Sequence, residues 1–388
     1  MKKLLYLLAL LSIVLSACGL APAAATTPAA SATATDAPTA TDTPTATPTA
    51  TLTFTPTPSY PPEGYGPSNF PAGVDPLTGL KVSNPALLQR RPMVIKVQNL
   101  PRDGRPQWGL SLADIVFEYY TEEGTTRFAA VFLGNDASIV GPIRSGRFID
   151  ADIVRGYKAM FAFGSAYVAE MKRFLNSEFA NRLVLEGPSS PLTRYDPKGK
   201  NYLVVNTADL AAFATQRDLS KAQNLDNMLF KLQAPSGGQA VTQVYVRYSS
   251  AIYNRWDYDT ASGKYMRFSD TVDASSGATG EQYAQLTDRL NGQPIAFDNV
   301  VVLYVNHQLY APNIYDIQLS GSGDAYIFRD GQAYKVKWVR NDTDVVSLTN
   351  PDGSPFAFKP GNTMFEVIGL ASSISQNGQS WRFTHNMP

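Results

Sequence analysis

Hydrophobic residues between positions 91 and 232 follow two spacings, one typical of strands and one typical of helices. The predicted strands are 93–97, 115–121, 126–133, 159–163 and 202–205, and the second and third form a hairpin around Glu123-Gly124. The predicted helices are 149–157, 168–175 and a third that begins at Thr207, whose hydroxyl is expected to accept a first-turn N–H. Alternating strands and helices predict an α/β domain, to which we assign residues 67–234.

The pattern changes after the Pro- and Gly-containing segment 234–238. Runs of β-branched and aromatic residues then predominate, which predicts strands. Dipeptides suited to tight hairpin turns separate the runs: Asn291-Gly292, Asp330-Gly331, Asp352-Gly353 and Asn377-Gly378. We therefore predict a mainly antiparallel β domain over 239–388, either a sandwich or a partly open barrel, and a mixed α+β fold class for the chain as a whole.

The N-terminus has the pattern of an export signal, in which Lys2 and Lys3 precede an apolar run over 4–15. This run is shorter than the roughly 20 residues of a spanning helix. Residues 15–18 resemble the lipobox of bacterial lipoproteins, which implies a signal peptide over 1–17 and a lipid on Cys18. The alternative is an ordinary signal peptide cut nearby, with Cys18 unmodified.

Residues 18–66 are dominated by Ala, Thr, Pro and Ser. A segment of this composition buries too little apolar surface to offset its chain entropy, so we predict a disordered tether. The tether either lifts the folded body through a cell-wall layer or is a tolerated low-complexity insertion.

Composition excludes several classes of protein. Basic and acidic residues balance at 33 each, so no charge excess indicates a nucleic-acid partner. One cysteine and two histidines are too few for a disulfide framework or a structural zinc site. We expect no metal and no cofactor, and we expect His307 to be structural.

The candidate chemistry lies in the first half of the chain. If the hairpin closes at Glu123-Gly124, Tyr120 faces Arg127 and Glu118 faces Ala129, so that Glu118 and Arg127 share one face of the sheet. One hypothesis is an ion pair that fastens the hairpin. A second is a fork-shaped anion site of Arg127, Arg144 and Arg147, and a third is catalysis with Glu118 or Glu122 as general base. The candidate ligand-binding residues are Arg105, Glu118, Arg127, Arg144, Ser145 and Arg147.

Several stretches resemble the YerB-like lipoproteins, a family built from an N-terminal and a C-terminal domain of unknown function. The stretches are 75–79, 105–110, 113–118, 126–128, 141–147, 321–323 and 360–363. The resemblance covers nearly everything after the tether, although Glu123 stands where the family tends to have glycine. It implies the two-domain body but no particular activity.

These observations predict a lipoprotein anchored by lipid at the extracytoplasmic face of a bacterial membrane. We expect a non-catalytic binding or accessory factor for an envelope protein or an anionic wall polymer. The alternative is a hydrolase or transferase that acts on envelope glycans or phosphodiesters.

Overall fold

The computed structural model describes residues 60–274 and 280–387. The predicted signal peptide, Cys18 and positions 18–59 of the predicted tether lie outside these residues. Within the described ranges, no helix has the length and hydropathy needed to cross a membrane. Residues just before position 67 already contact the body, since Tyr65 forms an isolated antiparallel bridge with Phe230.

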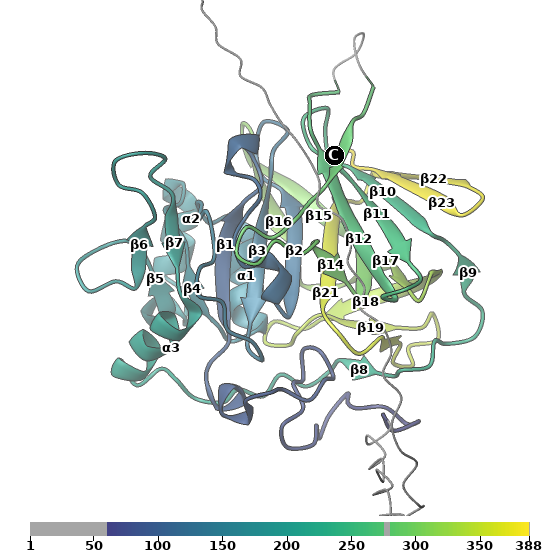
Figure 1. Cartoon of the computed structure of the whole chain (residues 1–388), viewed down its shortest axis with the longest axis horizontal. Coiled ribbons are helices and arrows are strands. Elements are labelled where there is room, and N and C mark those ends of the chain that lie inside the picture. Colours follow the sequence, from purple (N-terminus) through teal and green to yellow (C-terminus); the bar gives the residue numbers. More distant parts are fainter. Residues whose placement is uncertain (1–59, 275–279, 388) are drawn as a thin grey trace, which may run out of the picture. The chain divides into compact units, whose positions relative to one another are not determined.

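Helices make up a small part of the structure (Figure 1). The helices are α1 (Phe148–Gly156), α2 (Val168–Leu175), α3 (Thr207–Gln216) and the short 3-10 helices η1 (Pro85–Gln89), η2 (Arg102–Gly104), η3 (Leu110–Leu112) and η4 (Ala180–Arg182).

A twelve-stranded sheet contains strands from both halves of the chain. Its strands are β1 (Met93–Gln98), β2 (Ile115–Tyr120), β3 (Thr126–Phe132), β4 (Met160–Ala162), β5 (Leu183–Val184), β9 (Gln239–Ala240), β15 (Asn299–Ala311), β16 (Ile314–Gln318), β17 (Gly321–Arg329), β18 (Gln332–Arg340), β19 (Ser347–Thr349) and β21 (Thr363–Gly369). The main order is β19-β18-β17-β15-β21-β2-β3-β1-β4-β5. Strand β21 runs parallel to both β15 and β2, so it joins the two halves by backbone hydrogen bonds.

A seven-stranded sheet belongs to the second half alone. Its strands are β10 (Gln243–Arg247), β11 (Tyr253–Asp259), β12 (Lys264–Asp270), β13 (Tyr283–Gln285), β14 (Ala296–Phe297), β22 (Ser373–Asn377) and β23 (Ser380–Thr384). Two further pairs are β6 (Leu192–Arg194) with β7 (Leu203–Val205), and β8 (Leu229–Phe230) with β20 (Ala357–Phe358).

The two large sheets share one hydrophobic core, in the manner of a sandwich. Val116 and Met364 of the larger sheet belong to the same buried cluster as Trp256 and Phe383 of the smaller sheet. The other face of the larger sheet packs against α1, since Phe117 shares a second cluster with Ile153, Val154 and other residues of that helix. Strand β2 is therefore covered on both faces, which is why its apolar residues are nearly continuous along the sequence.

The predicted fold class is confirmed, and so are most of the predicted elements. The hairpin at Asp330-Gly331 connects β17 and β18, and both turn residues have positive φ, at 54° and 70°. The predicted cap of α3 is wrong. Asn206 caps this helix by accepting the Ala208 N–H at 2.8 Å, because Thr207 is already its first helical residue.

Candidate functional site

The turn between β2 and β3 contains a β-bulge. The Thr125 N–H donates to the carbonyl of Glu122 at 2.8 Å, as a two-residue loop of Glu123 and Gly124 requires. The Thr121 N–H donates to the carbonyl of the same Thr125 at 2.9 Å. Thr121 and Glu122 therefore both lie opposite Thr125, and this extra residue shifts the strand register and redirects the Glu122 side chain.

The predicted hairpin register is consequently wrong by one residue. Glu118 lies opposite Phe128 instead of Ala129, and Tyr119 takes the place opposite Arg127. Because successive side chains point to opposite faces of a sheet, Glu118 and Arg127 lie on opposite faces. The predicted ion pair between Glu118 and Arg127 therefore does not form.

Glu118 is instead fully buried in the core between the two sheets. Its carboxylate contacts Arg267 of β12 at 2.6 Å and accepts hydrogen bonds from Asn99 and Thr126 at 2.8 and 2.6 Å. Glu366 of β21 lies directly opposite Glu118 and contacts the same guanidinium at 3.3 Å. Burial and the charge of Glu118 raise the pKa of Glu366 to about 7, against the effect of Arg267.

Arg127 and Arg147 converge on Glu122 from β3 and from the start of α1. Arg147 donates to Glu122 through Nε at 2.8 Å and also through Nη2, while Arg127 Nη2 donates to Glu122 Oε1 at 2.8 Å. Arg147 Nη1 donates to the Gly146 carbonyl at 2.7 Å. Although burial alone would raise it, the hydrogen bonds and charges of the two arginines hold the pKa of Glu122 below its usual value.

A buried polar group lies behind these arginines. Lys96 Nζ lies 3.2 Å from Asp150 Oδ2, and the Tyr119 hydroxyl contacts both residues. Burial lowers the pKa of Lys96 to about 7, although Asp150 opposes this shift. The Arg147 N–H donates to Asp150 Oδ2 at 2.6 Å, so the group fixes the backbone from which the Arg147 side chain extends.

A cavity of about 310 Å³ opens beside Glu122. Its lining includes the bulged turn, Arg147, Glu170 of α2 and the turn between β15 and β16. The Tyr167 N–H donates to Glu170 Oε2 at 3.0 Å, while Glu170 Oε1 has no hydrogen-bond partner among the described residues. Glu170 is only 1% exposed, and burial raises its pKa. An unpartnered buried carboxylate oxygen is costly, so a bound ligand that donated a hydrogen bond would stabilise this arrangement.

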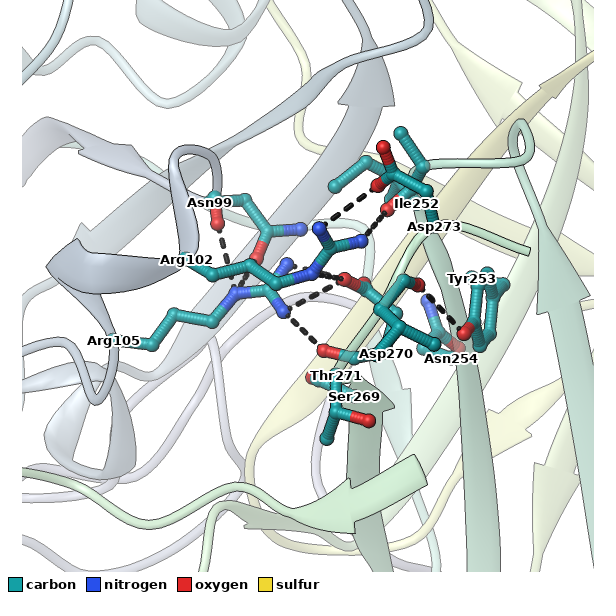
Figure 2. A network of polar contacts seen from close by, with 12 residues as sticks. Asn99, Arg102, Arg105, Ile252, Tyr253, Asn254, Ser269, Asp270, Thr271 and Asp273 are labelled. Carbon is teal, nitrogen blue, oxygen red and sulfur yellow. Dashed lines mark hydrogen bonds and ion pairs between the residues drawn. The ribbon is translucent and has the colours of Figure 1, made fainter. Parts of the chain in front are cut away.

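Arg105 lies in a separate network (Figure 2). Its guanidinium donates to the Asp270 carbonyl at 2.7 Å and to both Asp270 carboxylate oxygens at 3.0 and 3.1 Å. Arg102 donates to the same carboxylate at 2.7 Å and pairs with Asp273 at 2.8 Å. The network ties the segment around η2 to the end of β12, and the contacts of Arg105 there are structural.

The structure brings Ser145 into contact with Arg127, but it does not bring the Arg144 side chain there. Arg127 Nη1 donates to the Ser145 carbonyl at 3.0 Å, and the Ser145 hydroxyl contacts the hydroxyl of Ser165 at 2.8 Å. The Arg144 side chain makes no hydrogen bond or ion pair within residues 60–274 and 280–387. Of the three arginines predicted to form a fork, the structure therefore brings two onto a common partner.

Sequence reasoning missed Lys96, Tyr119 and Glu170. One signal was available for Lys96, a lone charge within the otherwise apolar run 93–97, because a lysine in a strand covered on both faces requires a buried partner. Glu170 is the glutamate of a capping box, three residues after the N-cap residue Tyr167. The usual sequence pattern has Ser or Thr at the N-cap, so the tyrosine made this box hard to recognise.

His307 and His385 lie side by side, with ring centroids 5.0 Å apart. Burial lowers the pKa of His307 to about 4 and that of His385 to about 3. His307 Nδ1 contacts the Val305 carbonyl at 2.9 Å, and the Gly369 N–H donates to His385 Nδ1 at 3.0 Å. These contacts agree with a structural role for both rings.

Three stretches of family resemblance meet at a second cavity, of about 350 Å³, lined in part by Asp75, Asp114 and Asn362. Asp114 accepts the N–H groups of Leu133 and Gly134 at 2.5 and 3.0 Å. Burial, opposed by these hydrogen bonds, leaves the pKa of Asp114 raised to about 6. Burial and the nearby Asp114 also raise the pKa of Asp75 well above its usual value.

Comparisons with known proteins give the class to which the chain belongs. The family model described as "Protein of unknown function (DUF3048) N-terminal domain" matches residues 77–220, and the corresponding C-terminal domain matches residues 244–365. The chain belongs to this family and carries both domains.

The family resemblance is thereby confirmed, and one relative is also known by structure. The chain is 29% identical over 313 residues to the protein named "Putative lipoprotein YerB" from Bacillus subtilis (strain 168), covering 78% of this chain and 88% of that protein. A crystal structure of YerB from Bacillus subtilis matches with a TM-score of 0.65 and 28% identity, over 78% of this chain and 99% of that chain.

Proposed function

We propose that this chain is a lipoprotein, anchored through Cys18 at the extracytoplasmic face of a bacterial membrane, that binds a ligand in the cavity beside Glu122. The lipobox-like residues 15–18 and the name of the YerB relative support the anchor. A single acyl chain gives only marginal membrane binding, so a stable anchor at Cys18 would need more than one chain.

The single observation that carries the binding proposal is the buried Glu170 carboxylate beside the cavity. One of its oxygens caps α2 and the other lacks a partner in the described part of the chain. The cavity volume of about 310 Å³ lies within the range of small-molecule sites. A ligand donor group would satisfy an oxygen that the fold itself leaves unsatisfied.

The surroundings of the two candidate bases favour binding over catalysis. A general base needs a pKa near the working pH and reach to the substrate. Glu118 is fully buried against Arg267, and Glu122 is held ionised by two guanidinium groups with its pKa below the usual value. Neither carboxylate meets both requirements.

The hypothesis of an anion fork stays a prediction. It requires that an anion can reach the Arg147 guanidinium. Glu122 occupies the edge of the Arg147 guanidinium that would form a two-point contact with phosphate or carboxylate. An anionic wall component would therefore have to displace Glu122 before Arg147 could bind it in this way.

A capture experiment tests the proposal. Fragments released from purified bacterial cell wall by muramidase would be passed over the immobilised full-length chain, and the retained material identified by mass spectrometry. Pro312 lines the cavity and is exposed, so Pro312→Trp should narrow the entrance, while Pro312→Ala is the matched control. We expect defined fragments on the wild type and the alanine variant but not on Pro312→Trp. Equal retention by all three proteins, or none by the wild type, would contradict the proposal.

A further inference from the structure

The charges around the cavity beside Glu122 indicate what kind of ligand group it accepts. Three carboxylate side chains line it, those of Glu122, Glu123 and Glu170, and two guanidinium groups lie beside them, Arg147 in the lining and Arg127 paired with Glu122. Charges of opposite sign attract most strongly where water is partly excluded, so this excess of acidic groups favours a cation. The following inference rests on the proposed function, because it names the ligand class of the same cavity.

The positive charge of Arg147 is already balanced within the protein. Two of its nitrogens donate to Glu122, and a third donates to the Gly146 carbonyl. Arg147 Nη1 lies 3.7 Å from Glu170 Oε2, which is too long for a hydrogen bond. Arg147 therefore orients Glu122 and leaves Glu170 without a direct charge-assisted hydrogen bond.

Glu170 supplies the observation that points to a ligand. Its Oε2 accepts the Tyr167 N–H, whereas its Oε1 is buried without a partner in the two described ranges. Burial raises the pKa of Glu170, although the charge of Arg147 opposes this shift. An ammonium group carries three N–H donors and a positive charge, so it would both satisfy Oε1 and favour the ionised form.

Two aromatic side chains complete the lining. Tyr167 is 49% exposed at the start of α2, and Tyr315 lies on β16. Tyrosine rings attract cations through the negative face of the ring, and carboxylates beside them add to that attraction. The combination suits a compact ammonium group on a short aliphatic stem.

We propose that the cavity binds a ligand through a primary ammonium group, as carried by a lysine-type side chain of a wall peptide. The ammonium lies between Glu170 and the carboxylates of the bulged turn, and its aliphatic stem contacts Tyr167 and Tyr315. In this proposal the cavity binds a positive charge, whereas the predicted fork of arginines would bind a negative one.

Calorimetric titration of the detergent-solubilised full-length chain tests the assignment with three probes: Nα-acetyl-lysine, Nα,Nε-diacetyl-lysine and inorganic phosphate. We expect only the first to bind. Glu170→Gln keeps an acceptor for the Tyr167 N–H but removes the charge, and it should weaken binding by about tenfold or more. Glu178→Gln is the matched control, since this exposed glutamate pairs with Arg155 and does not line the cavity.

The outcomes separate the two proposals. Equal binding of the acetylated probe, binding of phosphate alone, or an affinity unchanged in Glu170→Gln would overturn the ammonium assignment and leave the cavity as a binding site. If no probe binds, the ammonium assignment is overturned as well, and the wall-fragment capture decides the proposed function by itself. Should Glu170→Gln fail to fold, Glu123→Gln replaces it, because Glu123 is exposed and its loss removes charge without opening the core.

Discussion

Glu118 of β2 and Glu366 of β21 lie directly opposite each other on parallel strands, and both contact the guanidinium of Arg267, at 2.6 and 3.3 Å. The three side chains are almost completely buried. They come from both halves of the chain and from both large sheets. One guanidinium thus links the two halves at the centre of the shared core.

Removal of this guanidinium should be strongly destabilising. Arg267→Met leaves two buried carboxylates without their cation, and we expect a loss of about 3–5 kcal/mol in the free energy of unfolding. Urea denaturation measures the loss. Arg194→Met, at an exposed arginine paired with the exposed Glu186, serves as the control and should have little effect. A loss no greater than that of the control would show that Arg267 does not hold the carboxylates in place.

The pH dependence of stability should change in Glu366→Gln. Because the pKa of Glu366 is raised to about 7 in the fold, the folded chain binds more protons than the unfolded chain between about pH 4.5 and 7. The stability that this group contributes is present below pH 4.5 and is lost as the pH rises through 7.

The glutamine variant should therefore gain stability relative to the wild type over this window, by on the order of a few kcal/mol. Denaturant titrations at several pH values measure the difference. Glu63→Gln, at an exposed position, is the control. A constant difference between Glu366→Gln and the wild type from pH 4.5 to 8 would disagree with a raised pKa of Glu366.

Arg147 and Arg144 should differ in their effect on stability, although they are three residues apart. Arg147→Ala removes two donors to Glu122 and the contact with the Gly146 carbonyl, so we expect a loss of about 1–3 kcal/mol. Arg144→Ala removes a side chain without polar partners in the described structure and should cost clearly less. Thermal unfolding of both variants checks this order, and the reverse order would mean that the contacts of Arg147 are not the stabilising ones.

Cys18→Ser tests the anchor of the proposed function. Without a thiol to carry lipid, the protein should leave the membrane fraction or keep its signal peptide. Cell fractionation together with intact-mass analysis of the mature protein gives the readout. An unmodified Cys18 in membrane-bound wild-type protein would contradict lipidation.

Sequence patterns predicted the elements of this fold well because each depends on local spacing. The predicted helix 168–175 coincides with α2, and the hairpin dipeptides at 330–331 and 377–378 lie where β17–β18 and β22–β23 turn. The pairing of β21 with β2 was not predictable in this way. Residues 115–119 and 363–367 are adjacent only in the folded chain, and no local pattern indicates which distant strands pair in parallel.

The candidate site was predicted less completely than the fold, and the extra residue of the β-bulge accounts for much of the error. The turn at Glu123-Gly124 was placed correctly, but the bulge formed by Thr121 and Glu122 moved every following partner by one position. As a result, Glu118 faces the core, where it pairs with Arg267. Arg127 and Arg147 both pair with Glu122 instead. A bulge depends on the strands that flank the hairpin, and the sequence of the turn does not specify it.

Hydrogen–deuterium exchange of the full-length chain, with and without the wall fragment retained in the capture experiment, tests most directly whether the cavity is the binding site. Binding there should slow exchange together in three segments that are far apart in sequence, 121–125, 167–170 and 312–315. The Pro312→Trp variant should show no such change. Unchanged exchange in all three segments at saturating fragment, with protection elsewhere in the chain, would contradict the account.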